Sequence, residues 1–135
     1  MGKLLGIDYG DKRIGIATSD EKQDYIFPSD TMENSGNIIQ ELCDFIEKEN
    51  IETVVVGFPV NMSGEENAQS DRIKRFADEL RSRIRISVVL EDERLTSQFA
   101  ERLLKDIPGR RKPKGNIDRQ AAILILESYM GKNKK

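Results

Sequence analysis

The chain has 135 residues, a length at which a single domain buries roughly two-thirds of the surface of its unfolded chain. Apolar residues make up 37% of it and charged residues 34%, and no apolar stretch approaches the roughly 18 residues of a membrane span. The apolar segment Leu4 to Ile7 near the N-terminus is too short for the core of a secretory signal. We therefore expect one domain over residues 1–135, located in the cytoplasm and without a membrane partner.

The chain contains no histidine and a single cysteine, Cys43. This composition excludes catalytic triads and dyads that use imidazole, zinc sites that use histidine, and disulfide frameworks. The chemistry must then come from carboxylates, lysine, hydroxyl groups, the backbone or a metal held by oxygen atoms. Oxygen ligands favour Mg²⁺ or Mn²⁺.

The net charge of -2 conceals an uneven distribution. Residues 1–93 hold 11 basic and 20 acidic side chains, whereas residues 94–135 hold 11 basic and 4 acidic ones. A basic C-terminal third on an acidic body indicates a polyanionic partner, although solvated surface lysines explain the charge equally well.

The N-terminal half begins with short β-type runs. Lys3 to Tyr9 and Arg13 to Ser19 form a predicted hairpin, because Gly10-Asp11-Lys12 between them is typical of a tight turn. A third strand around Tyr25 to Phe27 is expected to stop at Pro28. Helical spacing follows in an apolar stripe that contains Ile38, Ile39, Leu42, Phe45 and Ile46.

Strands and helices then alternate. Thr53 to Phe58 is apolar without alternation, as in a strand covered on both faces, and Ile86 to Leu90 is a second such strand. Ser63 and Glu66 predict a capping box before the helix between these strands, whose stripe is Ile73, Phe76, Ala77, Leu80 and Ile84. Two more helices are expected, at Thr96 to Asp106 and at Ile117 to Met130, separated by a flexible basic loop over 107–116 and followed by a tail over 131–135. The order predicts an α/β fold with a mixed sheet, an antiparallel meander at one end and parallel strands at the other.

Acidic residues stand where ligands gather in such sheets, beyond the carboxyl ends of the parallel strands. Asp8 ends the first strand between glycines, Glu91-Asp92-Glu93 follow the strand at Ile86 to Leu90, and Asp118 lies near the start of the last helix. Each has an ordinary alternative: a turn carboxylate, a solvated acidic turn and an N-cap, respectively. Converging on one edge, such carboxylates would hold the metal ions of a two-metal nuclease, in which one ion activates water and the other stabilises the leaving oxygen.

Four stretches resemble, in order and spacing, the YqgF family, whose members are described as Holliday-junction resolvases or as pre-16S ribosomal RNA nucleases. They are Gly6-Ile7-Asp8-Tyr9-Gly10-Asp11-Lys12-Arg13-Ile14-Gly15-Ile16-Ala17, Gly57-Phe58-Pro59-Val60-Asn61-Met62-Ser63-Gly64, Asp92-Glu93-Arg94-Leu95-Thr96-Ser97 and Asp118-Arg119-Gln120-Ala121-Ala122-Ile123-Leu124-Ile125-Leu126. The resemblance covers essentially the whole chain. It implies a ribonuclease H-like fold with a mixed five-stranded sheet flanked by helices.

The resemblance also implies the site residues. It maps the catalytic, metal-binding acids onto Asp8, Glu93 and Asp118, and thereby selects Glu93 from three neighbouring acids, which strand alternation alone does not do. Mg²⁺ or Mn²⁺ is the implied cofactor. The departures from the common family pattern, Ser97 for threonine and Phe58 for leucine, leave this acidic set intact.

Basic and polar residues near these acids are candidates for nucleic-acid contacts, mostly to phosphates, which position a strand without reading its sequence. The candidates are Lys12, Arg13, Asn61, Arg94, Arg110, Arg111, Lys112 and Lys114. For Arg13 and Asn61, ordinary roles as a hairpin charge and a turn residue explain the sequence as well.

Two substrates and two other classes of function fit the sequence. The leading hypothesis is a metal-dependent nuclease that matures the 5′ end of pre-16S ribosomal RNA, and the alternative is a resolvase of four-way DNA junctions. A nucleic-acid-binding module without catalysis and an actin-like nucleotide binder are the other classes, the latter disfavoured because a single domain cannot close around a nucleotide. The chain is expected to be a monomer or a homodimer, since cleavage of a symmetric junction would need a pair of subunits.

Overall fold

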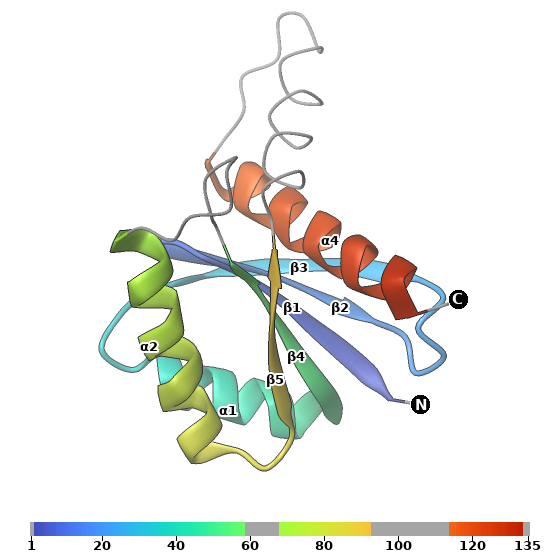
Figure 1. Ribbon diagram of the computed structural model, residues 1–135, viewed down its shortest axis with the longest axis horizontal. Coiled ribbons are helices and arrows are strands. Elements are labelled where there is room, and N and C mark those ends of the chain that lie inside the picture. Colours follow the sequence, from blue (N-terminus) through green and yellow to red (C-terminus); the bar gives the residue numbers. More distant parts are fainter. Residues whose placement is uncertain (1, 59–67, 93–113, 134–135) are drawn as a thin grey trace, which may run out of the picture.

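The computed structural model describes residues 2–58, 68–92 and 114–133, with the backbone alone at 28–30, 92, 114–120 and 132–133 (Figure 1). No helix among these residues is long and apolar enough to cross a bilayer.

One mixed sheet forms the centre of the molecule. Its five strands are β1 (Lys3–Tyr9), β2 (Arg13–Ser19), β3 (Ile26–Glu33), β4 (Ile51–Phe58) and β5 (Ser87–Asp92). They lie in the order β3-β2-β1-β4-β5. β1 pairs antiparallel with β2, and β2 with β3, whereas β1, β4 and β5 are mutually parallel. The carboxyl ends of these three parallel strands therefore meet at one edge of the sheet, as the sequence predicts.

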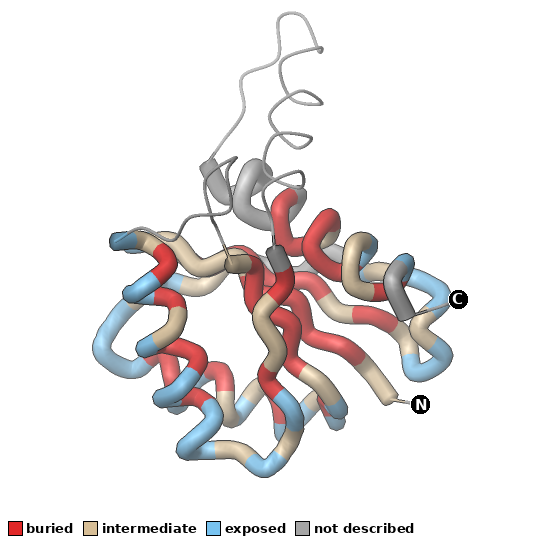
Figure 2. Tube along the Cα trace, in the orientation of Figure 1, coloured by how far each residue is buried: buried red, intermediate tan, exposed pale blue. Residues whose placement is uncertain are grey.

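Helices cover the two faces of the sheet. α1 (Ile38–Glu49) and α2 (Ala68–Arg83) pack on one face, where their apolar stripes meet alternate strand residues such as Leu5, Ile7 and Val56. α4 (Lys114–Asn133) lies across the other face, over Leu4, Ala17 and Val55 (Figure 1). Figure 2 shows the strands buried between these layers and the outer sides of α1 and α2 exposed. The α/β fold with a five-stranded mixed sheet is confirmed.

Several element boundaries differ from those predicted. β3 does not stop at Pro28 but continues to Glu33, because an edge strand has one side on which a proline needs no hydrogen-bonding partner; the pairing of β2 with β3 shifts register at this point. α4 begins at Lys114, so residues 114–116 form its first turn rather than part of a loop, and it includes residues 131–133 of the expected tail. The predicted capping box, the helix at Thr96 to Asp106 and residues 107–113 lie outside the described residues.

Candidate metal centre

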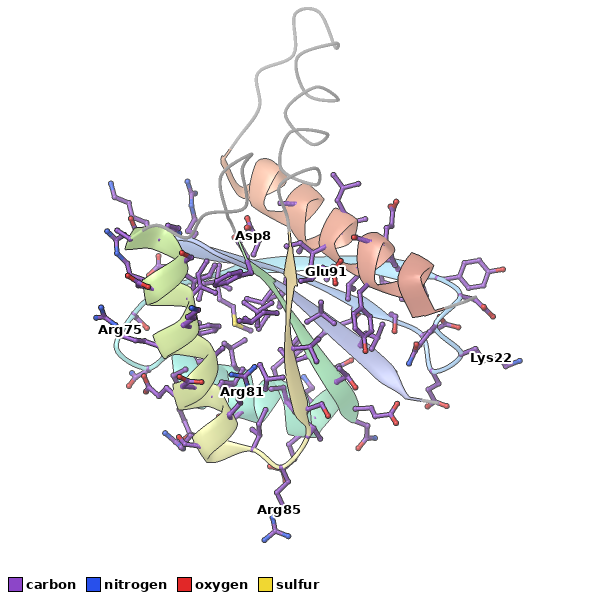
Figure 3. All side chains as sticks on the ribbon, in the orientation of Figure 1. Asp8, Lys22, Arg75, Arg81, Arg85 and Glu91 are labelled. Atoms are coloured by element: carbon purple, nitrogen blue, oxygen red, sulfur yellow. The ribbon has the colours of Figure 1, made fainter. Side chains whose placement is uncertain are left out.

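Asp8 lies at the carboxyl end of β1, where its backbone position pairs with Gly15 of β2. Because side chains alternate along a strand, Asp8 shares a face of the sheet with Leu4 and Gly6, and this is the face covered by α4. The side chain is half-buried, and it lies at the edge of the sheet where the parallel strands end (Figure 3). A carboxylate is thus held at the expected edge by a rigid strand.

α4 approaches β1 most closely at Gly6. A Cβ atom at this position would lie 2.6 Å from Cγ of Leu126 and 2.9 Å from the carbonyl oxygen of Ala122, so only glycine lets the helix pack here. α4 runs opposite to β1, and its N-terminal end lies over the carboxyl ends of the strands (Figure 1).

This crossing relates the backbone positions of Asp8 and Asp118. Asp8 lies two residues beyond Gly6, about 6.6 Å along a strand, and Asp118 lies four residues before Ala122, about 6 Å along a helix. Both displacements point toward the same edge of the sheet. The fold therefore brings the two backbone positions to one end of the β1–α4 contact.

Glu91 lies on the same face of the sheet but is enclosed between β5 and α4. Its side chain is 5% exposed and accepts a hydrogen bond of 2.7 Å from the hydroxyl of Ser128 (Figure 3). The sequence left its role open, and the structure gives it a packing contact with α4. Strand alternation would have indicated this position, because Val89, two residues earlier, also packs on the α4 side.

For the other two acids of the triplet, the structure describes the backbone of Asp92 alone. Asp92 ends β5 with its backbone opposite Phe58 of β4, and Glu93 lies outside the described residues. Among the side chains that the structure describes, no three carboxylate or thiol groups form a metal site. Of the three predicted acids, only Asp8 has a described side chain. The metal site of Asp8, Glu93 and Asp118 therefore stays a prediction. Its donor chemistry, carboxylate oxygens without nitrogen or sulfur, suits Mg²⁺ or Mn²⁺.

Three of the predicted nucleic-acid contacts lie within described elements. Lys12 is exposed in the turn between β1 and β2, and Arg13 begins β2 with its backbone opposite Glu33 of β3. Lys114 is the first residue of α4. The remaining candidates lie outside the described residues: Asn61, Arg94, Arg110, Arg111 and Lys112.

A cleft on the opposite face of the sheet was not predicted. It has a volume of about 350 Å³ and lies between the end of β1, the start of α1 and α2, with Arg72 and Arg75 among its lining residues. One signal in the sequence points to it: six of the 11 basic residues in the acidic region 1–93 fall between Arg72 and Arg85.

A family model and several known proteins match nearly the entire chain. A family model named RuvX and described as "Holliday junction resolvase" matches residues 2–132. A protein of Maridesulfovibrio salexigens is 38% identical over 96% of this chain and 98% of its own length, and one of Desulforudis audaxviator is 36% identical over 98% and 96%. Both bear the name "Putative pre-16S rRNA nuclease".

Solved structures share the fold at low sequence identity. The fowlpox virus resolvase, in a complex with Holliday junction DNA, superposes with a TM-score of 0.62 at 14% identity and covers 98% of this chain and 99% of its own. RuvC of T. thermophilus, in a complex with a Holliday junction substrate, gives 0.58 at 16% identity with 97% of each chain covered. The fold is thus the expected ribonuclease H-like one.

Proposed function

The chain belongs to the RuvX family of Holliday junction resolvases, and from this we propose that it is a metal-dependent nuclease that matures the 5′ end of pre-16S ribosomal RNA. The family consists of nucleases, so the reaction class is hydrolysis of a phosphodiester bond. The names of relatives that align over nearly their whole length support the RNA substrate. The observation that carries the site is the position of Asp8 at the strand edge over which α4 begins.

The proposed catalytic residues are Asp8, Glu93 and Asp118, which would hold two Mg²⁺ or Mn²⁺ ions. When bound, these ions would activate the attacking water and stabilise the leaving oxygen. β1 fixes the first carboxylate at the end of a buried strand, and the contact at Gly6 fixes the height of α4, and hence of the Asp118 backbone, above the sheet. Asp8 and the backbone of Asp118 are thus carried by a strand and a helix that pack on each other.

The basic candidates would align the substrate over these acids. Lys12 lies exposed in the turn that follows β1, close in sequence to Asp8, and is suited to a phosphate beside the cleaved one. Arg13, Asn61 and Arg94 also adjoin the strand ends in sequence, and Arg110, Arg111, Lys112 and Lys114 precede or begin α4. This substrate would place the protein in the cytoplasm, as a monomer or a homodimer.

A cleavage assay tests the function and the site together. Wild type, Asp8→Asn and Asp78→Asn are compared on a pre-16S RNA fragment with Mg²⁺ or Mn²⁺. Asp78 is a suitable control because it is exposed on α2, where it forms an ion pair with Arg81 three residues away. We expect Asp8→Asn to lose more than about a hundredfold in rate, beyond the usual cost of removing an outer-shell partner of a metal, and Asp78→Asn to keep its activity. Equal cleavage by all three proteins would refute the site.

Cleavage of four-way DNA is the second candidate, favoured by the description of the family model and by the shared fold of the two resolvases. The same assay with a four-way junction decides between the substrates through the ratio of kcat/KM values. A higher value for the junction, together with a dimer in sedimentation equilibrium, would favour the resolvase, because the two symmetric strands need a pair of active sites.

A further inference from the structure

The cleft beside α2 combines an apolar floor with a polar, cationic rim. The ring centroids of Tyr9 and Phe76 lie 4.7 Å apart in its lining. Three charged residues of α2 also line it: Arg72, Arg75 and Glu79. The cleft is open to solvent at the side where the arginines stand, because both of them are exposed. Such a lining suits a ligand that has a compact apolar part and an anionic group.

The two arginines differ in their partners. Arg72 donates a hydrogen bond of 2.9 Å from Nη1 to the carboxylate of Asp11, an ion pair in which both side chains are about half exposed or more. Within the described part of the chain, Arg75 has no ion pair or side-chain hydrogen bond. An exposed ion pair contributes little free energy, so Arg72 can exchange Asp11 for another anion at small cost.

The start of α1 adds to the positive potential of the cleft. Ser35 and Gly36 line it directly before the helix, and Asn37 at the N-cap makes no side-chain capping hydrogen bond. The helix dipole therefore favours an anion on this side, while the N–H of Ile38 already donates to the carbonyl oxygen of Ser35 and Glu41 adds a negative charge in the same turn. Among the described residues of the cleft lining, Glu79 is the one carboxylate, against two guanidinium groups.

The cleft adjoins the proposed metal centre around the end of β1. Tyr9 directly follows Asp8, so their Cα atoms are about 3.8 Å apart, and their side chains belong to opposite faces of the sheet. Gln69 of α2 donates a hydrogen bond to the carbonyl oxygen of Tyr9, and the Asp11–Arg72 pair joins the turn after β1 to α2. A strand that leaves Asp8 across this turn therefore reaches Arg72 and Arg75.

We propose that this cleft binds a phosphate group of the nucleic-acid substrate away from the cleaved bond, with Arg75 as its main contact and Arg72 joining after release from Asp11. The proposal rests on the proposed nuclease function and assigns it a second binding subsite on the far side of the strand edge. Its apolar floor accepts the sugar or base that adjoins the phosphate.

Binding measurements in the Asp8→Asn background test the subsite without cleavage. A labelled pre-16S RNA fragment is titrated at several salt concentrations with Arg75→Ala and with the control Arg85→Ala. Arg85 is an exposed arginine beyond the other end of α2, far from Asp8 (Figure 3). We expect Arg75→Ala to weaken binding by about tenfold, as for one charge-assisted contact, and to reduce the salt slope by about 0.7 to 0.9. Arg85→Ala should bind like the parent.

Two further variants add charge to the cleft or remove it without touching an arginine. A Cβ atom at Gly36 meets no atom within 4 Å, so Gly36→Glu and Gly36→Gln should both fold normally. Gly36→Glu should weaken binding, and Gly36→Gln should bind like the parent. Asp11→Asn removes the ion pair of Arg72, which keeps a hydrogen bond to Gln69, and should strengthen binding more than Asp78→Asn, which removes an ion pair of the same length from Arg81 elsewhere on α2.

The outcomes separate this inference from the function on which it rests. Parental affinity and salt slope in Arg75→Ala, or an equal loss in Arg85→Ala, would overturn the subsite even if Asp8→Asn abolishes cleavage. Cleavage that survives Asp8→Asn would overturn the metal centre, and the Arg75 result would still report whether the cleft binds nucleic acid. In the active protein, Arg75→Ala should raise KM and leave kcat unchanged.

Discussion

Gly6 determines how closely α4 lies on the sheet. An added Cβ would meet Leu126, which can rotate, and the carbonyl oxygen of Ala122, which moves only with the helix. We expect Gly6→Ala to lower the free energy of unfolding by about 1–3 kcal/mol, as overpacked cores do, and to reduce cleavage because α4 carries Asp118. Urea denaturation measures the first effect. Gly36→Ala is the control, because its added methyl group enters open space; equal stability of the two variants would contradict the close approach.

Ser128 supplies a hydrogen bond to the buried carboxylate of Glu91. Ser128→Ala removes this hydrogen bond, so we expect a loss of about 1 kcal/mol in the free energy of unfolding. Ser82→Ala is the matched control, since its hydroxyl is exposed and donates to a carbonyl within the same helix. If the two serine variants unfold at the same urea concentration, the Glu91 contact does not hold α4 to β5.

The carboxylate of Asp20 stabilises the turn between β2 and β3, together with backbone hydrogen bonds of the same turn. Asp20 accepts hydrogen bonds of 2.8 Å from the backbone N–H groups of both Tyr25 and Asp24, and these bonds, that of Tyr25 foremost, hold the pKa of Asp20 below its ordinary value of 3.8. A lowered pKa in the folded state means that this stabilisation is present above pH 3.8 and is lost as the pH falls through the lower, folded value.

Acid titration of stability tests the role of this turn. We expect Asp20→Ala to be less stable than wild type at neutral pH, and the difference to shrink steadily once the pH falls below 3.8. Urea midpoints across this range provide the measurement. A difference that stays constant with pH would show that the variant acts through something other than the charged, hydrogen-bonded carboxylate.

Strands and helices were predicted best where the residues that determine their bounds lie close together in the sequence. The bounds of β1 and β2 were predicted to the residue, because alternation and the Gly10 turn lie within seventeen residues of sequence. The extension of β3 past Pro28 was missed, since the tolerance of an edge strand for proline depends on its place in the sheet. The start of α4 at Lys114 was missed because Gly115 normally argues against a helix interior.

The same distinction applies to the functional residues: local sequence indicates some of them, and only the tertiary fold brings the others together. The position of Asp8 near a strand end was predicted from the local sequence, and β1 confirms that position, whereas its role in a metal site stays a prediction. The cleft was not found, because its lining comes from separate segments around residues 9, 34–39 and 72–79 that only the tertiary fold assembles. The enclosure of Glu91 was missed for the same reason: its partner Ser128 is 37 residues away.

Over the whole molecule, two groups of basic residues flank the acidic triplet Glu91-Asp92-Glu93 in sequence. One is the segment that contains Arg110, Arg111, Lys112 and Lys114, and the other is the group on α2 at the cleft. We expect replacement of the four basic residues of the first region by alanine to reduce the salt slope of nucleic-acid binding by about three. Addition of Arg75→Ala should reduce it further by the amount found for that variant alone, because well-separated sites act additively. A combined slope equal to that of either variant alone would contradict two independent regions.

The contact of α4 with β1 also has a consequence for the newly made chain. The ribosome releases β1, β2 and β3 first, yet the helix that covers Leu4, Ala17 and Val55 lies at residues 114–133. This face of the sheet thus lacks its covering helix until residues 114–133 have been made, and the same helix brings the last of the three proposed carboxylates. A nascent chain that stops before this helix would then lack one of the proposed acids, so we expect it to have no nuclease activity.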